Sequence, residues 1–317
     1  MLTSGFIDLQ VNGYGGVDFN QDDLTAEQLH AACLRLREGG TDTILATIIT
    51  EHLEKMAARI ARIVELRQHD PLAAKLIGGI HVEGPFINPA DGYRGAHPAD
   101  AVRSANVDDM KRLLDAGAGL VRIVTLAPER DPGLATTRML ARQGIVVAAG
   151  HCDSTLDELL AAIDAGLSMF THLGNGCPMR MHRHDNIIQR ALSLADRLRI
   201  SFIADGAHVP FFALRNYLRA AGIDRCIIVS DAVAPAGLGP GRYNLGRWDL
   251  HIGEDLVARA PDRSHLIGSA ITMRQAAHNL STSLGLSDSD VDVLCRLNPR
   301  RLLGEDSANA PERQGAN

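Results

Sequence analysis

The sequence predicts an α/β fold in which eight parallel strands alternate with helices and close into a (β/α)8 TIM-type barrel. Short β-forming runs alternate with longer helix-like segments along almost the whole chain. Several runs, such as residues 226–230, are nearly continuously apolar, which is typical of parallel strands buried on both faces. The chain has 317 residues, and a barrel of this type needs about 250.

Eight strands can be placed in order along the chain. They are predicted at residues 5–12, 41–49, 75–83, 120–127, 145–151, 168–173, 200–205 and 226–231. Helices are predicted between them, at residues 24–37, 211–221 and 271–284, and residues 154–157 have a sequence typical of a helix start. Strands joined by helical crossovers indicate a parallel sheet.

The alternative to a barrel is a doubly wound open sheet. Such a sheet more often carries a glycine-rich phosphate-binding loop directly after its first strand. Gly13-Tyr14-Gly15-Gly16 follows the first predicted strand, but it does not match GxGxxG and no convincing helix begins directly behind it. The closed barrel is therefore favoured.

Two regions lie outside this alternation. Residues 237–264 contain strand-like pieces at 242–245, 248–252 and 256–259, which predict a β-hairpin excursion after the eighth strand. Residues 305–317 are polar and contain Gly, Pro, Ser and Asn, so we expect a disordered tail. The predicted barrel domain accordingly spans residues 1–304.

Composition narrows the classes of function. The formal net charge of -6 argues against sequence-independent binding to nucleic acid. No apolar run is long enough to cross a bilayer, and the N-terminus lacks the pattern of a secretory signal. The five cysteines form no CxxC pair, and their odd number favours reduced thiols in a cytoplasmic protein over a disulfide framework. We therefore expect a small-molecule substrate, with no nucleic-acid or membrane partner.

Polar residues collect at the C-terminal ends of the predicted strands, where the active site of a barrel forms. They are Glu83, His151, His172, His208 and Asp231. Two imidazoles and one carboxylate are a typical catalytic zinc ligand set, and Asp231 would then be the free carboxylate that moves protons. A single histidine is more often a hydrogen-bonded structural residue, but unpaired polar groups at several strand ends would be costly to bury.

A series of short motifs resembles, in order and spacing, the N-acetylglucosamine-6-phosphate deacetylases, a family of the amidohydrolase superfamily. The resemblance extends from residue 5 to about residue 304. The motifs are GFIDLQVNG at residues 5–13, HVEGPF at 81–86, GH at 150–151, THLGN at 171–175, ADGAH at 204–208, SDAVAPAG at 230–237 and GSA at 268–270. Each motif is weak alone, and their shared order makes the resemblance specific.

The resemblance implies metal ligands at Glu83, His151 and His172. The first strand carries Gln10 and Asn12 where many amidohydrolases carry His-x-His and hold a second ion. Neutral amides are poor zinc ligands, so we expect one divalent metal ion per site. Zinc is the expected ion, and iron, manganese and cobalt accept the same ligand set.

The resemblance also implies a set of substrate-binding residues. They are Ala96, His97, Asn175, Gly176, Arg183, His208, Leu266, Ile267 and Gly268. His97 matches a histidine that helps to hold the substrate carbonyl, which makes it a catalytic residue together with Asp231. Arg183 matches a phosphate-binding arginine, although its loop, residues 179–184, is equally typical of a solvated basic loop. Gly176 departs from the family, whose members commonly have alanine at this position.

The implied activity is hydrolysis of the acetamide of N-acetylglucosamine 6-phosphate to glucosamine 6-phosphate and acetate. One alternative is an amidohydrolase that acts on N-acetylgalactosamine 6-phosphate, an unphosphorylated N-acyl sugar or a cyclic amide. Another is a non-catalytic sugar-phosphate-binding barrel, and a third is a structural barrel without a ligand. The presence of Asp231 and of the full set of metal ligands favours an enzyme.

One difference from the family concerns the accessory domain. Relatives usually have an N-terminal segment that joins C-terminal strands in a small β-sandwich beside the barrel. This chain begins almost directly at the first predicted strand. We therefore expect the β-sandwich to be largely missing, or reduced to residues 237–264. The resemblance implies a homodimer, and this difference leaves its interface open.

Overall fold

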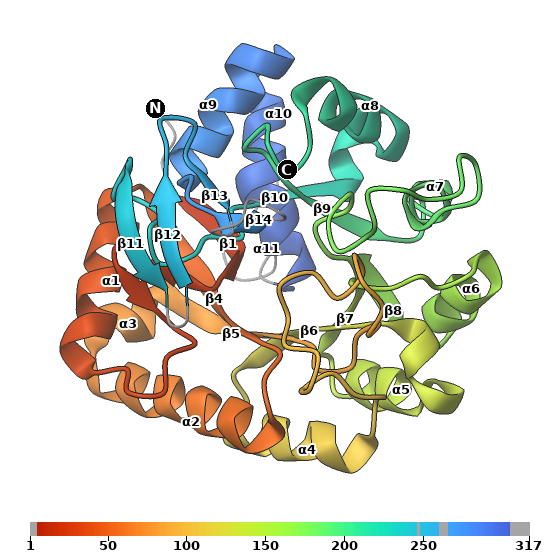
Figure 1. Cartoon of the computed structure of the whole chain (residues 1–317), viewed down its shortest axis with the longest axis horizontal. Coiled ribbons are helices and arrows are strands. Elements are labelled where there is room, and N and C mark those ends of the chain that lie inside the picture. The colour runs from red at the N-terminus through yellow and green to blue at the C-terminus, as the bar shows by residue number, and fades with distance from the viewer. Residues whose placement is uncertain (1–4, 246–247, 260–265, 305–317) are drawn as a thin grey trace, which may run out of the picture.

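In the computed structural model, eight parallel strands close into a barrel, as the sequence predicts (Figure 1). The structure describes residues 5–245, 248–259 and 266–304. Neighbouring strands pair in the order β1-β4-β5-β6-β7-β8-β9-β10, and each of these ladders is parallel. The barrel strands are β1 (Phe6–Val11), β4 (Thr41–Ile49), β5 (Ile77–Glu83), β6 (Val121–Leu126), β7 (Val146–Ala149), β8 (Leu167–Phe170), β9 (Arg199–Ile203) and β10 (Cys226–Val229).

The seam between β1 and β10 is held by a few specific contacts rather than by a continuous ladder. Val11 and Ala232 form an isolated parallel bridge, and the backbone N–H of Asn12 donates to the carbonyl of Ala232 at 2.7 Å. Nearer the start of β1, the buried carboxylate of Asp8 accepts the backbone N–H of Ser230 at 3.1 Å and its hydroxyl at 2.5 Å. At this point the carboxylate of Asp8 accepts the hydrogen bonds that a backbone carbonyl accepts elsewhere in the sheet.

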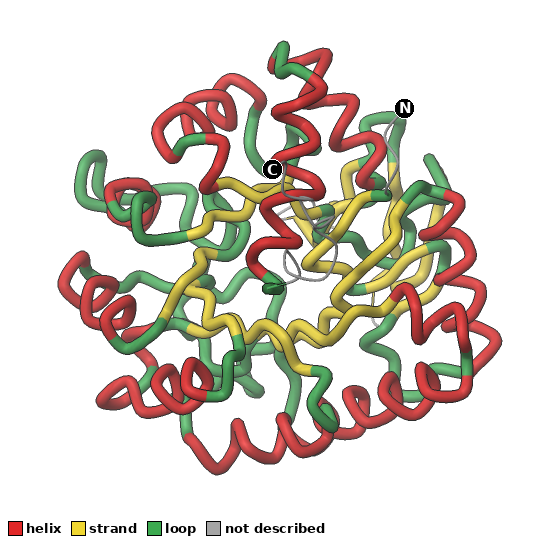
Figure 2. The backbone as a smooth tube through the Cα atoms, turned by 180° about the vertical axis from the view of Figure 1, so that it is seen from behind, coloured by secondary structure: helices red, strands yellow, loops and turns green. Residues whose placement is uncertain are grey.

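Helices cover the outside of the barrel (Figures 1 and 2). They are α1 (Ala26–Glu38), α2 (Leu53–His69), α3 (Pro71–Leu76), α4 (Val107–Ala116), α5 (Ala135–Arg142), α6 (Leu156–Asp164), α7 (Ile187–Ser193), α8 (Phe211–Ala221), α9 (Met273–Leu284), α10 (Asp288–Asp292) and α11 (Asn298–Leu302), with short helical turns η1 (Pro128–Arg130), η2 (Pro132–Leu134), η3 (Ile223–Arg225) and η4 (Val293–Leu297). Capping boxes start α1, with Thr25 and Gln28, and α6, with Thr155 and Glu158.

Apolar side chains fill the barrel itself as well as the space between strands and helices. The interior cluster is formed by Ile7, Leu9, Leu45, Ile123, Ala148, Met169, Ile203, Ile227, Val229 and Leu303. Leu303 directly follows α11, and its carbonyl accepts a hydrogen bond from Arg122 near the start of β6, so α11 lies at the end at which the strands begin. The opposite end, at which the strands finish, is therefore the end that can accept a ligand.

Two smaller sheets accompany the barrel. A two-stranded hairpin of β2 (Gly13–Tyr14) and β3 (Val17–Asp18) directly follows β1. A four-stranded antiparallel sheet follows β10 and contains β11 (Gly241–Leu245), β12 (Trp248–Ile252), β13 (Val257–Arg259) and β14 (Leu266–Ser269). The sequence predicts strand-like pieces for β11 to β13 but not β14. The predicted tail at residues 305–317 lies outside the described residues, and reduction of the accessory domain stays a prediction.

Most strand boundaries differ from the prediction by one to three residues, and three of these differences bear on the site. β5 begins at Ile77 rather than at residue 75, because residues 71–76 form α3, whose first backbone N–H groups are capped by the side chain of Asp70. β7 ends at Ala149 and β8 at Phe170. His151 and His172 therefore lie two residues beyond their strands, in turns rather than in the sheet.

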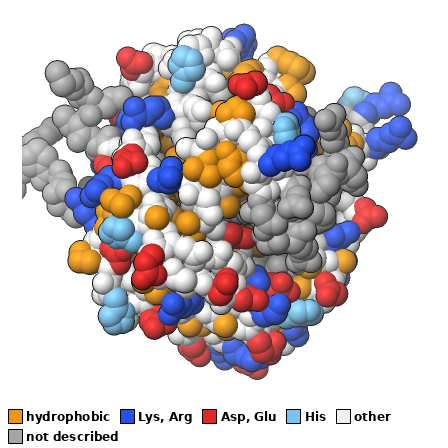
Figure 3. Space-filling model, turned by 60° about the vertical axis from the view of Figure 1, so that its left-hand side comes forward, with side chains coloured by type: hydrophobic (Ala, Val, Ile, Leu, Met, Phe, Trp, Pro, Cys, Tyr) orange, Lys and Arg blue, Asp and Glu red, His pale blue; other side chains and the backbone are white. Residues whose placement is uncertain are grey.

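Other expectations concern the surface and the thiols. On the face in Figure 3, acidic and basic side chains are intermingled over the described surface. None of the described helices combines the length and the apolar character that crossing a bilayer requires. The five cysteines are free thiols, as expected from their number and spacing.

Candidate active site

Three polar side chains meet at the C-terminal end of the barrel strands. Nε2 of His172 lies 2.9 Å from Oε1 of Glu83, Nε2 of His151 lies 3.3 Å from the same oxygen, and the two nitrogens are 3.1 Å apart. All three residues are buried. Residues that are far apart in the sequence are thus brought into one cluster by the ends of β5, β7 and β8.

The backbone at the strand ends directs these side chains. Glu83 is the last residue of β5. His151 has φ 52° and His172 has φ 32°, and Asp231, two residues after β10, has φ 49°. L residues rarely adopt this left-handed region, and such strained residues cluster at functional sites, where the surrounding structure holds them. The repetition at three strand ends therefore points to a function shared by these side chains.

Hydrogen bonds fix the orientation of the cluster. Nδ1 of His151 lies 2.8 Å from the carbonyl oxygen of Tyr93, so it donates there and leaves a lone pair on Nε2. Nε2 of Gln10 donates to both carboxylate oxygens of Glu83, at 3.1 Å each. An ionised carboxylate accepts hydrogen bonds at both of its oxygens, as Glu83 does here from Gln10. Glu83 is therefore ionised.

This donor set fits a divalent cation. One carboxylate oxygen and two imidazole nitrogens form a triangle with sides of 2.9, 3.3 and 3.1 Å. In a tetrahedral zinc site with these ligand types, the ligand atoms are about 3.3–3.5 Å apart. The lone pair on Nε2 of His151 faces other electron-rich atoms, and a cation between them would turn repulsion into attraction. The Glu/His/His cluster is thus able to hold a divalent metal ion.

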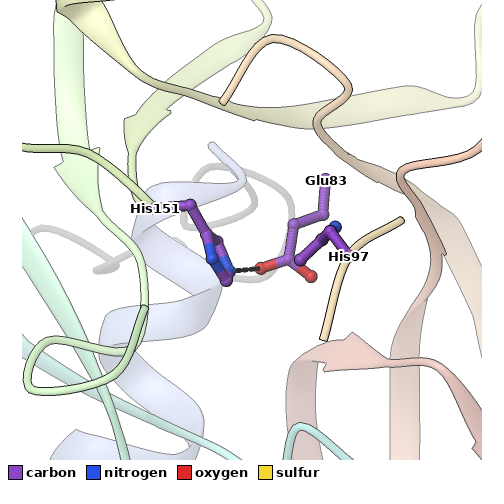
Figure 4. Close-up of side chains that lie close together, drawn as sticks. All are labelled: Glu83, His97 and His151. Atoms are coloured by element: carbon purple, nitrogen blue, oxygen red, sulfur yellow. Dashed lines mark hydrogen bonds and ion pairs between the residues drawn. The ribbon is translucent and has the colours of Figure 1, made fainter. Parts of the chain in front are cut away.

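His97 borders the cluster from the long loop between β5 and α4 (Figure 4). Its ring packs edge-on to that of His151, with centroids 4.4 Å apart, and Glu83, His97 and His151 offer ligand atoms within 4.8 Å of one another. The closer contact of His172 with Glu83 favours His172 as the third ligand. Burial and the neighbouring His151 lower the pKa of His97 to about 3. Its ring is therefore neutral and can donate one hydrogen bond.

Asp231 completes the site from the seam of the barrel. Nδ2 of Asn12 donates to Oδ1 of Asp231 at 2.7 Å. Burial raises the pKa of Asp231 and the charge of Glu83 raises it further, whereas His172 and the hydrogen bond from Asn12 lower it. A carboxylate whose pKa is raised above the ordinary value is better able to accept a proton and return it.

The chain is similar along almost its whole length to deacetylases of N-acetylated sugar phosphates. The chain is 33% identical to the N-acetylglucosamine-6-phosphate deacetylase of Bos taurus over 315 residues, which cover 96% of this chain and 75% of the relative. It is 28% identical to the N-acetylgalactosamine-6-phosphate deacetylase of Escherichia coli O157:H7 over 306 residues, which cover 96% of this chain and 79% of the relative. No protein-family model matches the chain.

A solved structure supports the same relationship. An N-acetyl-D-glucosamine-6-phosphate deacetylase from Mycobacterium smegmatis, a mutant in complex with N-acetyl-D-glucosamine-6-phosphate, is 33% identical to this chain. The match has a TM-score of 0.84 and covers 95% of this chain and 77% of the other. The chain belongs to the N-acetylglucosamine-6-phosphate deacetylase family. It is therefore a hydrolase of the amidohydrolase superfamily.

Among the residues that the deacetylase family assigns to the substrate, His208 is held by a buried carboxylate. Its Nδ1 lies 2.6 Å from Oδ2 of Asp205. Oδ1 of Asp205 accepts the backbone N–H groups of Ala207 and His208 at 2.9 and 2.8 Å. The charge of His208 lowers the pKa of Asp231, which places His208 within electrostatic reach of the site.

Asn175 and Gly176 follow His172 in the turn after β8. Nδ2 of Asn175 donates to the carbonyl of His172 at 3.0 Å. Gly176 has φ 58°, and a Cβ at this position would lie 2.8 Å from Nδ1 of His151. The glycine that departs from the usual alanine of the family is thus required by this local backbone, because a side chain would press on a histidine of the cluster.

Residues 266–268 lie beside the backbone of Asp231. The N–H of Ser269 donates to the carbonyl of Asp231 at 3.0 Å, and the N–H of Val233 donates to the carbonyl of Ser269 at 3.0 Å. Gly268 has φ 64°, and a Cβ there would lie 2.5 Å from Cγ1 of Val233 and 3.1 Å from the carbonyl oxygen of Asp231. The strand that sequence reasoning missed, β14, therefore positions this predicted family segment.

Two predicted residues are not drawn into the cluster. Arg183 and Ala96 are exposed. Within the described ranges, Arg183 makes no hydrogen bond or ion pair, and it lies in the loop between β8 and α7. Its phosphate-binding role in this member of the family stays a prediction.

Sequence reasoning missed the partners of the family's functional side chains. From sequence alone, Gln10 and Asn12 count only as poor metal ligands, whereas in the structure they donate to Glu83 and Asp231. A signal for this exists, because residues two apart on a strand face the same side. The partner of His151 gives no such signal, because it is the backbone carbonyl of Tyr93, a group that every residue carries.

Proposed function

We propose that the chain hydrolyses the acetamide of N-acetylglucosamine 6-phosphate, giving glucosamine 6-phosphate and acetate. The observation that carries the proposal is the half-buried carboxylate of Asp231 beside the Glu83–His151–His172 cluster in a member of this family. The relatives from Bos taurus and Mycobacterium smegmatis are named for this activity. A cation-binding cluster and a free carboxylate are the components that metal-assisted amide hydrolysis requires.

Asp231 is the residue that moves the proton. Its ionised carboxylate removes a proton from the water that attacks the acetyl carbon, while the new C–O bond forms. Asp231 then returns this proton to the amide nitrogen as the C–N bond breaks, so that a neutral amine departs. The raised pKa of Asp231 favours the return of the proton, and the hydrogen bond from Asn12 favours its initial ionised state.

Glu83, His151 and His172 would hold the metal ion. When bound, such an ion polarises the acetyl carbonyl and lowers the pKa of a coordinated water. We propose zinc, because one carboxylate and two imidazoles are a typical catalytic zinc ligand set. The amides of Gln10 and Asn12 are engaged as donors to carboxylates, which supports one ion per site rather than two.

His97 would donate a hydrogen bond to the oxygen of the acetyl carbonyl. Its ring is neutral and buried, and its Nδ1 has no partner among the described residues. A neutral donor that is fixed by packing against His151 costs little reorganisation. Its hydrogen bond strengthens as negative charge develops on the carbonyl oxygen, so it stabilises the transition state more than the substrate.

The sugar would be oriented by residues around this centre. Asn175 and His208 offer polar atoms to its hydroxyl groups, and Arg183 offers a guanidinium to its phosphate. Ala96, Gly176 and residues 266–268 would contribute backbone contacts. Binding energy from groups far from the reacting bond then contributes to the rate.

We also propose a cytoplasmic homodimer. The five free thiols suit a reducing compartment. Arg183 is exposed in its own subunit, and a neighbouring subunit over this loop would exclude water from a bound phosphate and so strengthen the contact.

Acetate release from matched substrates tests the proposal. We expect the highest kcat/KM on N-acetylglucosamine 6-phosphate, a lower value on N-acetylgalactosamine 6-phosphate, and the lowest on unphosphorylated N-acetylglucosamine. The Asp231→Asn variant, prepared identically, controls for contaminating activity. If the metal-loaded protein binds these sugars but releases no acetate from any of them, the non-catalytic sugar-phosphate-binding barrel replaces the enzyme.

The second candidate substrate is N-acetylgalactosamine 6-phosphate. Relatives from Escherichia coli O157:H7 and a Shewanella strain, 28% and 32% identical to this chain, are named for this sugar. The two sugars differ only in the configuration of one hydroxyl group, so the same reacting centre serves both. A higher kcat/KM on the galacto substrate would make it the preferred one.

A further inference from the structure

Asn12 is joined to Asp231 through its side chain. Its Nδ2 donates to Oδ1 of Asp231 at 2.7 Å, across 219 positions of sequence. A carboxylate oxygen that is ionised only accepts hydrogen bonds, so the amide nitrogen, and not the amide oxygen, must face it. The orientation of the Asn12 amide is therefore set by the charge of Asp231.

The main chain of Asn12 is fixed at the same place. Its N–H donates to the carbonyl of Ala232, the residue after Asp231, at 2.7 Å. Its own carbonyl accepts the N–H of Phe19 at 2.9 Å, and the residue is buried. Backbone and side chain thus tie the end of β1 to Asp231 and to the residue after it. Asn12 has little freedom to follow a carboxylate that rotates.

This contact makes the two carboxylate oxygens of Asp231 different from each other. Oδ1 is occupied by Asn12, whereas Oδ2 makes no hydrogen bond to any residue within the described ranges. The left-handed backbone of Asp231, with φ 49°, leaves the side chain without support from a regular strand. Without Asn12, the carboxylate could rotate about its last bond and present either oxygen.

We propose that Asn12 is the positioning residue of Asp231: it holds Oδ1 so that Oδ2 alone exchanges the proton with water and with the leaving nitrogen. The inference rests on the proposed function, because it assigns Asp231 to proton transfer. It gives Asn12 a role in catalysis at a strand position where many amidohydrolases carry a metal-binding histidine. Asn12 itself touches no substrate atom in this role.

The position predicts which kinetic constants change. Asn12 makes no hydrogen bond to the three cluster residues in the described structure, so we expect its loss to leave the metal content and KM nearly unchanged. A hydrogen bond to a charged group corresponds to about 10–100-fold in rate. We therefore expect Asn12→Ala to lower kcat by about this factor.

A pH profile separates positioning from general damage. Donation from Asn12 favours the ionised form of Asp231, so its removal raises the pH at which the base becomes active. The other charged groups that act on Asp231 are Asp8 on β1, Glu83 at the end of β5, His172 beyond β8 and His208 beyond β9. Asn12→Ala leaves all of them in place. Asn12→Asp has the same shape but no donor, and its negative charge should shift the acidic limb of kcat further upward.

Asn298 provides a matched control. It is a fully buried asparagine at the opposite end of the barrel, where its Nδ2 donates to the carbonyls of Ile223 and Cys226. Asn298→Ala should lower the melting temperature without moving the acidic limb of the kcat profile. The comparison therefore shows whether loss of a buried amide is by itself enough to change catalysis.

The experiment measures kcat, KM, metal content and the kcat–pH profile on acetate release by the wild type and the three variants. A lower kcat with an upward-shifted acidic limb in both Asn12 variants, and unchanged limbs in Asn298→Ala, is the expected result. Wild-type kcat in Asn12→Ala, or a loss of kcat with an unmoved limb, overturns the positioning role alone. A wild-type chain that releases no acetate overturns the proposed function, and this inference with it.

Discussion

Oδ2 of Asp205 lies 2.6 Å from Nδ1 of His208, and both side chains are almost completely enclosed. Burial alone would raise the pKa of Asp205, but the hydrogen bond and charge of His208, together with two backbone N–H donors, lower it. Asp205 is therefore ionised at neutral pH. With Nδ1 engaged, His208 can offer only Nε2 to a ligand.

Replacing Asp205 by asparagine should reduce stability in a pH-dependent way. Because the folded-state pKa of Asp205 is depressed, its contribution is present above the unfolded value and is lost as pH falls through the folded value. Asp205→Asn should lower the free energy of unfolding at pH 7 by about 1–3 kcal/mol. Urea unfolding at several pH values measures the difference in unfolding free energy between wild type and variant. This difference should become smaller below about pH 4. An equal difference in unfolding free energy between wild type and variant at pH 7 and pH 3 would show that the charge of Asp205 does not contribute to stability.

The cluster should bind about one metal ion per chain, since the three-residue set forms a single site. His172→Ala should lose most of this metal, because it removes a nitrogen 2.9 Å from Oε1 of Glu83. Elemental analysis after dialysis is the measurement. His30→Ala is the control, because His30 is exposed and pairs with Asp70 on the surface. Two ions per fully loaded site would contradict the interpretation of Gln10 and Asn12.

Arg183 should distinguish phosphorylated from unphosphorylated sugars. A charge-assisted contact of about 1.5–3 kcal/mol predicts that Arg183→Ala lowers kcat/KM on N-acetylglucosamine 6-phosphate by about 10–150-fold. The unphosphorylated sugar should be much less affected. Arg180→Ala, in the same exposed loop, is the matched control for the general charge of this region. Equal losses of kcat/KM on both substrates would show that Arg183 does not bind the phosphate.

Asp231→Asn should abolish most of the turnover while preserving the fold and the metal. The amide is nearly isosteric with the carboxylate, but it cannot accept and return a proton. Removal of a general acid–base corresponds to roughly a 10²–10⁴-fold loss of kcat. Acetate release, metal content and sugar affinity should be measured on one preparation. Loss of the metal together with activity would make Asp231 a ligand, and near wild-type turnover would exclude it from the mechanism.

The barrel could be predicted because its strands are marked by the sequence itself. Runs such as β10, in which every residue is buried, have no polar alternation, which is typical of interior parallel strands. β14 gave no comparable signal, because its four residues include a glycine and its pairing depends on β13. The start of β5 was misplaced because the cap at Asp70 begins a short helix inside an apolar stretch.

The site could be predicted as a set of residue types but not as a network. Histidines and carboxylates at strand ends are visible in sequence, because the barrel places all such ends together. Their hydrogen-bond partners depend on three-dimensional proximity, as in the 73-residue separation of Gln10 and Glu83. Backbone acceptors such as the carbonyl of Tyr93 cannot be seen in sequence at all.

The contact of Asp8 with Ser230, which joins the first and last barrel strands, can form only after almost all of the barrel has been synthesised. The three cluster residues lie between positions 83 and 172, so all of them have left the ribosome well before β10 is synthesised. Asp8 binds Ser230, which lies 222 residues later in the chain, and Asn12 binds Asp231, which lies 219 residues later. Asp231 exists only once the residues after β10 have been synthesised, whereas the three cluster residues precede it in the chain. The contacts of Asp8 and Asn12 that close the barrel therefore also bring Asp231 to the cluster end of the barrel.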